Sequence, residues 1–131
     1  MRKLIMFTFM ATFGFVLTSP AFAGNDASIK GKQREGIQRE MTNFIVKSQL
    51  DGHFLHYDPV SGELKKLKLD KLHDGIVKKG NFFVSCADFT DVKGKKYDLD
   101  FMVIEKNGEH HVVQTLVHAV EGKKRPYQVE K

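Results

Sequence analysis

Hydrophobic and polar positions alternate most regularly between residues 81 and 120. Apolar-rich runs occupy residues 82–90, 97–105 and 110–120, and turn signals at Lys93-Gly94 and Asn107-Gly108 separate them. Alternating runs of β-branched and aromatic residues bounded by glycine and asparagine are typical of strands joined by tight turns. The pattern therefore predicts a three-stranded antiparallel meander, on which the rest of the chain packs.

Before this meander the apolar spacing changes to steps of three and four. Between residues 33 and 50 these steps place one set of side chains on a single helical face. The set is Ile37, Met41, Phe44, Ile45 and Ser48. Gly52 follows, where a glycine commonly ends a helix. We therefore expect one helix over residues 33–50, with its apolar stripe against the sheet.

Two shorter strands are expected between the helix and the meander. Residues 53–57 alternate aromatic residues with histidines, and residues 58–62 contain a proline and a glycine at turn spacing. Residues 63–71 then form a second strand, or residues 62–73 form a helix. We favour the strand because the tight turn before it makes a hairpin. His73-Asp74-Gly75 predicts a break after it.

The pairing of the last two strands follows from their turn. Asn107-Gly108 is the preferred sequence of a two-residue hairpin loop. Counting outward from it gives the predicted pairs Lys106 with Glu109, Ile104 with His111, Met102 with Val113, Asp100 with Thr115 and Asp98 with Val117.

The turn near Gly94 does not fix its own register, and a slip of one residue exchanges every side chain between the two faces. In one register Asp88 faces the core beside Leu99. In the other the core-facing residues are Phe83, Ser85, Ala87 and Phe89. Burying an unpaired carboxylate is unfavourable, so we expect the second register.

That register divides the outer face of the sheet, the face turned away from the helix, into two halves. The apolar half consists of Val84, Cys86, Met102, Ile104, Val113 and Val117. The acidic half consists of Asp88, Asp98 and Asp100. A solvated face does not need so many large apolar side chains. We therefore expect the apolar half to be covered by the chain or to bind a partner.

The first 23 residues have the pattern of a cleaved secretory signal peptide. Arg2 and Lys3 precede an apolar run at residues 4–17, and Ala21-Phe22-Ala23 offers a small-x-small cleavage site. An N-terminal anchor helix is the alternative, but the run is shorter than the roughly 20 residues of a membrane span. We expect a periplasmic or secreted protein without stable membrane anchoring after cleavage. Residues 24–32 are then a flexible mature N-terminus, and residues 33–131 a single α+β domain.

Charge and cysteine content narrow the function further. The formal net charge is +5, of which the predicted signal peptide contributes two units. A charge this mild, without an arginine cluster, argues against a nucleic-acid partner. Cys86 is the only cysteine, so the exported domain has no internal disulfide. We interpret it as a small apolar strand residue, because it lacks the electropositive surroundings of a reactive thiol.

The acidic half is the main candidate for chemistry. Asp88, Asp98 and Asp100 converge on one face, where carboxylates can bind a hard cation such as calcium or form an acid–base pair. A solvated acidic edge balanced by lysines is the plainer interpretation. The six histidines contain no metal-binding motif, and His53 and His56 point to opposite faces of a strand. We predict no cofactor and no enzymatic activity.

One helix followed by a long antiparallel meander resembles the cystatin-like and nuclear-transport-factor-2-like α+β folds. In these folds a curved sheet wraps around a helix. The resemblance covers residues 33–120 and is architectural, because the cystatin Gln-Val-x-Val-Ala-Gly loop is missing. Segments 86–89 and 97–101 also resemble small uncharacterised exported bacterial proteins, a likeness that implies no activity. The predicted fold is one N-terminal helix packed on a curved antiparallel meander of about five strands.

Two functions fit these observations. The first is a non-catalytic exported binding module whose apolar half contacts an unknown protein partner or a second copy of the chain. The second is a small-ligand or cation-binding domain that uses Asp88, Asp98 and Asp100.

Overall fold

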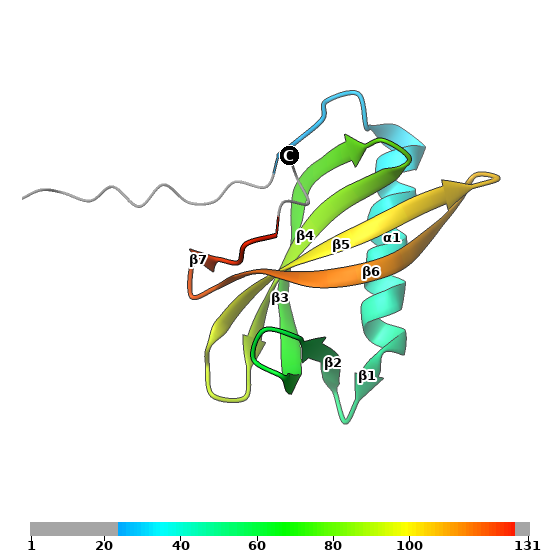
Figure 1. Cartoon of the computed structure of the whole chain (residues 1–131). Helices are drawn as coiled ribbons and strands as arrows, with labels where there is room; N and C mark the ends of the chain where they lie inside the picture. Colours follow the sequence, from blue (N-terminus) through cyan, green and yellow to red (C-terminus); the bar gives the residue numbers. More distant parts are fainter. Residues whose placement is uncertain (1–23, 128–131) are drawn as a thin grey trace, which may run out of the picture.

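The computed structural model describes residues 24–127, so the predicted signal peptide lies outside the described residues. Within this range one helix precedes seven strands (Figure 1). The elements are α1 (Gly31–Lys47), β1 (Gln49–Leu50), β2 (His53–Asp58), β3 (Glu63–Lys79), β4 (Phe82–Asp91), β5 (Lys96–Lys106), β6 (Glu109–Val120) and β7 (Lys123–Lys124). No helix among residues 24–127 is long and apolar enough to cross a bilayer.

Each strand pairs with the next one along the chain, and every pair is antiparallel. The α+β class is therefore confirmed. The prediction of about five strands is too low because β1 and β7, of two residues each, extend the sheet at both edges. The helix also ends earlier than predicted. The N–H of Ser48 donates to the carbonyl oxygen of Phe44 at 3.0 Å, and β1 begins one residue later.

Aromatic rings fill the inner face of the sheet, the face turned toward α1. The stripe of α1 buried against it consists of Gly36, Ile37, Met41 and Ile45. The ring centroid of Phe54 lies 5.4 Å from that of Phe89 and 6.3 Å from that of Phe101. Burying one large apolar side chain contributes about 1.5–3 kcal/mol. This cluster is therefore the main source of stability in a domain without a disulfide.

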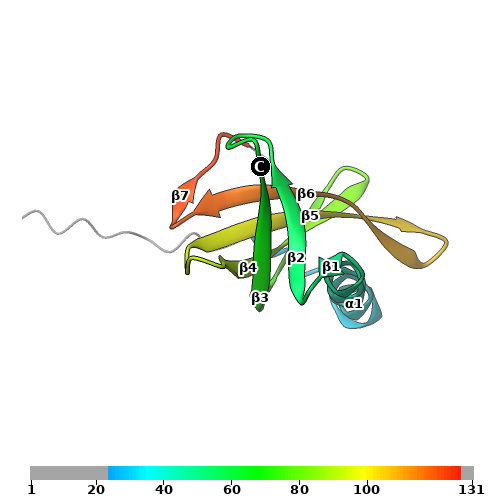
Figure 2. The same cartoon turned by 90° about the horizontal axis from the view of Figure 1, so that it is seen from below.

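The sheet bends so strongly that β2 and the start of β3 run across β5 and β6 (Figure 2). Nδ1 of His56 in β2 lies 3.0 Å from Oγ1 of Thr115 in β6, although three strands separate the two in the sheet. Beyond β7, Nη2 of Arg125 donates to Oδ2 of the buried Asp58 at 2.8 Å. These side chains hold the concave inner face closed.

β3 is a continuous strand, so the alternative of a helix over residues 62–73 is wrong. The predicted break at His73-Asp74-Gly75 is instead a bulge. Leu72 pairs with Ala87 and Ile76 with Ser85, which leaves three residues of β3 opposite Cys86 alone. Bulges bend a strand and re-aim its side chains. β3 therefore changes direction at His73 without ending.

The predicted register between β4 and β5 is confirmed. Ala87 pairs with Leu99, and Asp88 pairs with Asp98. This register keeps Asp88 out of the inner core, but the outer face is also buried at its centre, where Asp100 is 1% exposed. The fold buries this carboxylate together with hydrogen-bond donors instead of keeping it in solvent.

Between β5 and β6 the predicted register holds only near the turn. Lys106 pairs with Glu109 as predicted. Val113 is then an extra residue in β6, so Met102 pairs with Gln114 instead of Val113. A single extra residue moves all later side chains of the strand to the opposite face.

A second bulge in β6 reverses the alternation again, so the last two residues of the strand face the sides that the sequence predicts. Leu99 pairs with Val117 and Asp98 with Ala119, which leaves His118 as the extra residue. The predicted pair of Asp98 with Val117 is therefore wrong. Val117 is 2% exposed and belongs to the inner core, because the extra residue Val113 places it on the inner face and His118 on the outer one.

Residues 24–30 pack along the sheet before α1 begins. The N–H of Asp26 donates to the carbonyl oxygen of Ile76 at 2.7 Å, and Ile29 is buried in the core. A Cβ atom on Gly24 would lie 2.7 Å from Cγ1 of Val77, so the chain passes directly over β3. The flexibility of residues 24–32 stays a prediction, and hydrogen exchange at Asp26 is its direct test.

Candidate functional site

Six polar side chains meet on the outer face of the sheet, over β4 and β5. Four belong to the paired strands themselves, with Cys86 opposite Asp100 and Asp88 opposite Asp98. The other two are histidines at bulges in the flanking strands β3 and β6. We call this set the outer-face cluster: His73, Cys86, Asp88, Asp98, Asp100 and His118.

The β3 bulge is held in place from two sides. Nη1 of Arg34 in α1 donates to the carbonyl oxygen of Asp74, and Oγ of Ser85 in β4 donates to that of Gly75 at 2.9 Å. The bulge thereby keeps His73 over β4. Nε2 of His73 lies 2.9 Å from Oδ1 of Asp88, close enough for a hydrogen bond that the ring donates.

Asp100 is the buried anchor of the cluster. Sγ of Cys86 donates to its Oδ1 at 2.8 Å, and Nδ1 of His118 donates to its Oδ2 at 2.9 Å. His118 reaches the outer face because the extra residue Val113 reverses the alternation of β6. Hydrogen bonds to both oxygens offset the loss of hydration that burial imposes on a carboxylate. Asp100 in turn fixes the position of the Cys86 thiol.

Asp98 is the least supported carboxylate of the cluster. Its Oδ1 atom is buried and has no hydrogen-bond partner within residues 24–127. Burial raises the pKa of Asp98 to about 6, against the opposing charges of His73 and His118 and with the help of the neighbouring carboxylates. This oxygen is therefore the atom of the cluster with the most to gain from a ligand.

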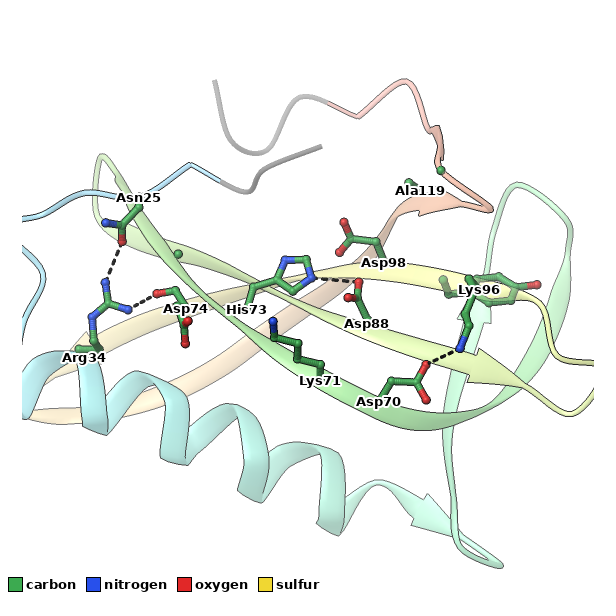
Figure 3. Close-up of a pocket in the computed structure, with 13 residues that line it drawn as sticks. Asn25, Arg34, Asp70, Lys71, His73, Asp74, Asp88, Lys96, Asp98 and Ala119 are labelled. Carbon is green, nitrogen blue, oxygen red and sulfur yellow. Dashed lines mark hydrogen bonds and ion pairs between the residues drawn. The ribbon is translucent and has the colours of Figure 1, made fainter. Parts of the chain in front are cut away.

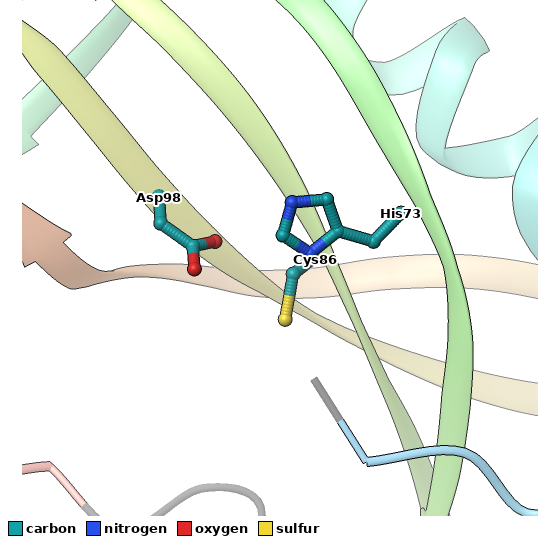
Figure 4. Close-up of side chains that lie close together, drawn as sticks. All are labelled: His73, Cys86 and Asp98. Atoms are coloured by element: carbon teal, nitrogen blue, oxygen red, sulfur yellow. The ribbon is translucent and has the colours of Figure 1, made fainter. Parts of the chain in front are cut away.

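His73, Cys86 and Asp98 come closest to forming a metal centre (Figure 4). One donor atom from each, a ring nitrogen, a sulfur and a carboxylate oxygen, lie within 4.8 Å of one another. They come from the adjacent strands β3, β4 and β5, and their side chains point toward a common point. Nitrogen, sulfur and oxygen donors in such a group are typical ligands of zinc and related ions.

A pocket of about 1060 Å³ opens above this group (Figure 3). His73, Asp88 and Asp98 line it, whereas Cys86 is 1% exposed and does not. Two basic side chains in the wall are engaged by the chain itself. Lys96 contacts Asp70 at 3.2 Å, and Arg34 binds the carbonyl oxygen of Asp74. The pocket therefore presents carboxylates and imidazole to a ligand, together with the ammonium group of Lys71, which stands opposite Asp88 in the sheet.

The structure brings together all three aspartates of the predicted acidic half, through the register that the sequence predicts. The predicted apolar half is less available to a partner. Val84, Cys86 and Val117 are buried, Met102 and Ile104 are half-buried, and Val113 is 52% exposed at its bulge.

The sequence pattern does not group the two histidines, His73 and His118, with the three aspartates. For His73 a signal exists, because a histidine directly before Asp-Gly interrupts an otherwise regular strand. For His118 the alternation of β6 points to the inner face, and only the bulge reverses it. A pattern of period two contains no information on extra residues in a strand.

Two other histidines are buried apart from the cluster. His56 stacks on Phe54, and burial lowers its pKa while the charge of Asp58 acts to raise it. His110 packs against the helix at Gly36, where an added Cβ atom would lie 2.6 Å from the ring. Both belong to the packing of α1 and β2 on the inner face.

Comparison of the chain with protein-family models, with curated proteins and with solved structures finds no match. The candidate site therefore depends on the geometry described above.

Proposed function

We propose that this protein is a non-enzymatic domain that binds a divalent cation through the outer-face cluster. The convergence of Asp88, Asp98 and Asp100 below a pocket, with one buried oxygen of Asp98 lacking a partner, carries the proposal. A cation on the pocket side of Asp98 supplies the partner that this oxygen lacks.

The charge distribution favours a cation over an anion. The chain as a whole is basic, with a formal net charge of +5, yet three carboxylates stand on two adjacent strands at one point. Neighbouring like charges and burial both disfavour the ionised form of a carboxylate. A bound cation offsets both effects, so relief of the unfavourable electrostatic free energy of the cation-free site contributes to binding.

The scaffold favours binding with little rearrangement. Asp88 lies in β4, and Asp98 and Asp100 lie in the neighbouring strand β5. Asp100 is held by two hydrogen bonds. Ligands fixed on strands lose less conformational entropy on binding than ligands on loops. The site is therefore preorganised at Asp100 and Cys86 and adjustable at Asp98 and His73, which line the pocket.

A protein partner or a second copy of the chain on the outer face stays a prediction. Among the six residues of the predicted apolar half, only Val113 is largely exposed, so the apolar surface available to such a partner is small. The exported location is likewise an expectation, supported by the signal-like residues 1–23. A cystatin-like fold is supported by one helix on a bent antiparallel sheet, and such a likeness assigns no function.

Thermal unfolding with and without added ions tests the proposal. A ligand present at about 100 times its Kd stabilises the folded state by about 2.7 kcal/mol, which raises Tm by several degrees in a domain of this size. We expect such a rise with at least one of zinc, calcium and magnesium, and its reversal by a chelator.

The matched variants are Asp98→Asn, in the cluster, and Glu35→Gln, on the exposed surface of α1. The first is expected to lose the ion-dependent rise in Tm and the second to keep it. An unchanged Tm with all three ions would contradict the proposed function.

A further inference from the structure

We infer that the bound cation is a thiolate-binding transition-metal ion of the zinc class, held by a ring nitrogen of His73, Sγ of Cys86 and a carboxylate oxygen of Asp98. This inference rests on the proposed cation-binding function and names the metal class and the ligands. Two of these three residues, His73 and Cys86, lie outside the aspartate group expected to bind calcium.

Donor chemistry separates the candidate ions. Calcium takes six to eight oxygen ligands and magnesium an octahedron of oxygens, mostly water. The atoms that converge here are one nitrogen, one sulfur and one oxygen. Zinc binds this mixture in a tetrahedron, and soft thiolate ligands select zinc, copper(I) and iron over calcium and magnesium.

The distances allow one ion to reach all three atoms. Zinc bonds of about 2.0 Å to nitrogen and oxygen and 2.3 Å to sulfur place tetrahedral ligands roughly 3.5 Å apart. The three atoms of this site lie within 4.8 Å of one another. Small side-chain rotations of His73 and Asp98, both at the pocket, close the difference while buried Cys86 stays in place.

The surrounding residues orient the ligands as they do in metal sites. Ligating histidines commonly donate their other ring N–H to a carboxylate. Asp88 lies 2.9 Å from Nε2 of His73, so Nδ1 is the nitrogen assigned to the metal. Before metal binding, the Cys86 thiol donates to Asp100 at 2.8 Å, and Asp100 is itself held by His118. Asp88, Asp100 and His118 are therefore positioning residues.

Three protein ligands leave one tetrahedral position, which we expect to face the pocket because His73 and Asp98 line it. Cys86 closes the site from below, whereas His73 and Asp98 form the wall through which an ion enters. Sites with three protein ligands keep the fourth position for water or a small ligand. The predicted site therefore accepts an exchangeable ligand from the pocket side.

Metal binding by Cys86 is an acid–base step that needs no oxidant or reductant. The S–H bond of Cys86 breaks, and with it the hydrogen bond that this group donates to Asp100. The sulfur keeps the electron pair and bonds the metal ion, and the proton leaves to solvent. Metal ligands must be deprotonated, so metal binding to thiols releases protons.

Titration with Co²⁺, a spectroscopic substitute for zinc, tests the inference on the native protein. We expect one equivalent of Co²⁺ to produce a sulfur-to-metal charge-transfer band in the near ultraviolet and the visible bands of a tetrahedral site, both removed by excess Zn²⁺. Calcium is expected to remove neither. The variants are Cys86→Ser, His73→Gln and Asp98→Asn, with His111→Gln, a half-exposed histidine in another part of β6, as the matched control.

The Cys86→Ser variant is expected to lose the charge-transfer band, and the other two to weaken Zn²⁺ binding at least about tenfold. His111→Gln is expected to behave as the native protein. Cation binding without a thiolate band, or with calcium alone, would overturn the inference and leave the proposed function intact. Absence of binding by Co²⁺, Zn²⁺, Ca²⁺ and Mg²⁺ alike would overturn both. The spectrum of the native protein with Co²⁺ tests the inference even if a variant does not fold.

Discussion

The thiol of Cys86 donates a hydrogen bond of 2.8 Å to Oδ1 of Asp100, directly across the β4–β5 pair and with both side chains 1% exposed. A core built for stability alone would place apolar side chains at such a pair, because burying a carboxylate is costly even when it is hydrogen-bonded. The pair therefore marks the place where the sheet departs from simple packing. Departures of this kind are expected at functional sites.

The first prediction is that Asp98→Asn stabilises the cation-free protein near neutral pH. Because the folded-state pKa of Asp98 is raised to about 6, its ionised form destabilises the fold above that pH. The effect fades as the pH falls from about 6 toward the ordinary value near 4. Urea unfolding at about pH 8 should show a gain on the order of 1–2 kcal/mol, and a much smaller gain at about pH 4.

The control for this prediction is Glu35→Gln, which should leave stability unchanged within about 0.5 kcal/mol at both pH values. A loss of stability in Asp98→Asn at the higher pH would show that the Asp98 carboxylate is satisfied in the cation-free protein. That result would remove the main electrostatic argument for the site.

The second prediction concerns Arg34, which binds the β3 bulge through the carbonyl oxygen of Asp74. Arg34→Ala should loosen the bulge that carries His73 and reduce cation affinity about tenfold, the usual effect of removing a residue that orients a ligand. Isothermal titration calorimetry measures the change. Arg39→Ala, on the exposed side of the same helix, should bind as the native protein does. Equal affinities in the two variants would contradict a positioning role for Arg34.

The third prediction concerns the closure of the bent sheet. Burial acts to raise the pKa of Asp58, but hydrogen bonds from Val60 and Ser61 and the charge of Arg125 hold it below its ordinary value. Arg125→Met removes a partner from a buried carboxylate, and the free energy of unfolding should fall by about 2–3 kcal/mol at neutral pH.

Because a lowered carboxylate pKa contributes stability that is lost as pH falls through it, this difference should shrink below about pH 4. Lys124→Met, in the exposed strand β7, is the matched control and should have little effect. An Arg125→Met variant as stable as the native protein at pH 7 would show that the Asp58–Arg125 pair does not hold the sheet closed.

The fourth prediction concerns the contact between α1 and β6. Gly36 is buried, and a Cβ atom there would lie 2.6 Å from Nδ1 and Cε1 of His110. Alanine is favoured over glycine in a helix by about 1 kcal/mol, whereas overpacking a core costs about 1–3 kcal/mol. Gly36→Ala should therefore be net destabilising, and the double variant Gly36→Ala/His110→Ala less so than the two single effects summed. Simple additivity in chemical unfolding would contradict the contact.

Much of the fold could be predicted from the sequence because it depends on local signals. The stripe of Ile37, Met41 and Ile45 predicts the helix, and Asn107-Gly108 predicts its hairpin. The choice of register between β4 and β5 also proved correct. It followed from the need to keep Asp88 out of the core, although the outer face turned out to bury Asp100.

The candidate site could be predicted only in part, because two of its six members depend on bulges. The Asp88, Asp98 and Asp100 group follows from alternation along two strands. His73 and His118 reach the same point only because β3 and β6 contain extra residues at or before those positions. Such insertions depend on long-range packing, which a local pattern does not record.

The central claim is that an ion binds between His73, Cys86 and Asp98. The most direct measurement is anomalous X-ray diffraction at the zinc absorption edge from crystals of the protein grown with equimolar zinc. We predict one strong anomalous peak between these three side chains, with the metal about 2.3 Å from Sγ of Cys86. A peak only at surface residues elsewhere, or no peak at all, would contradict it.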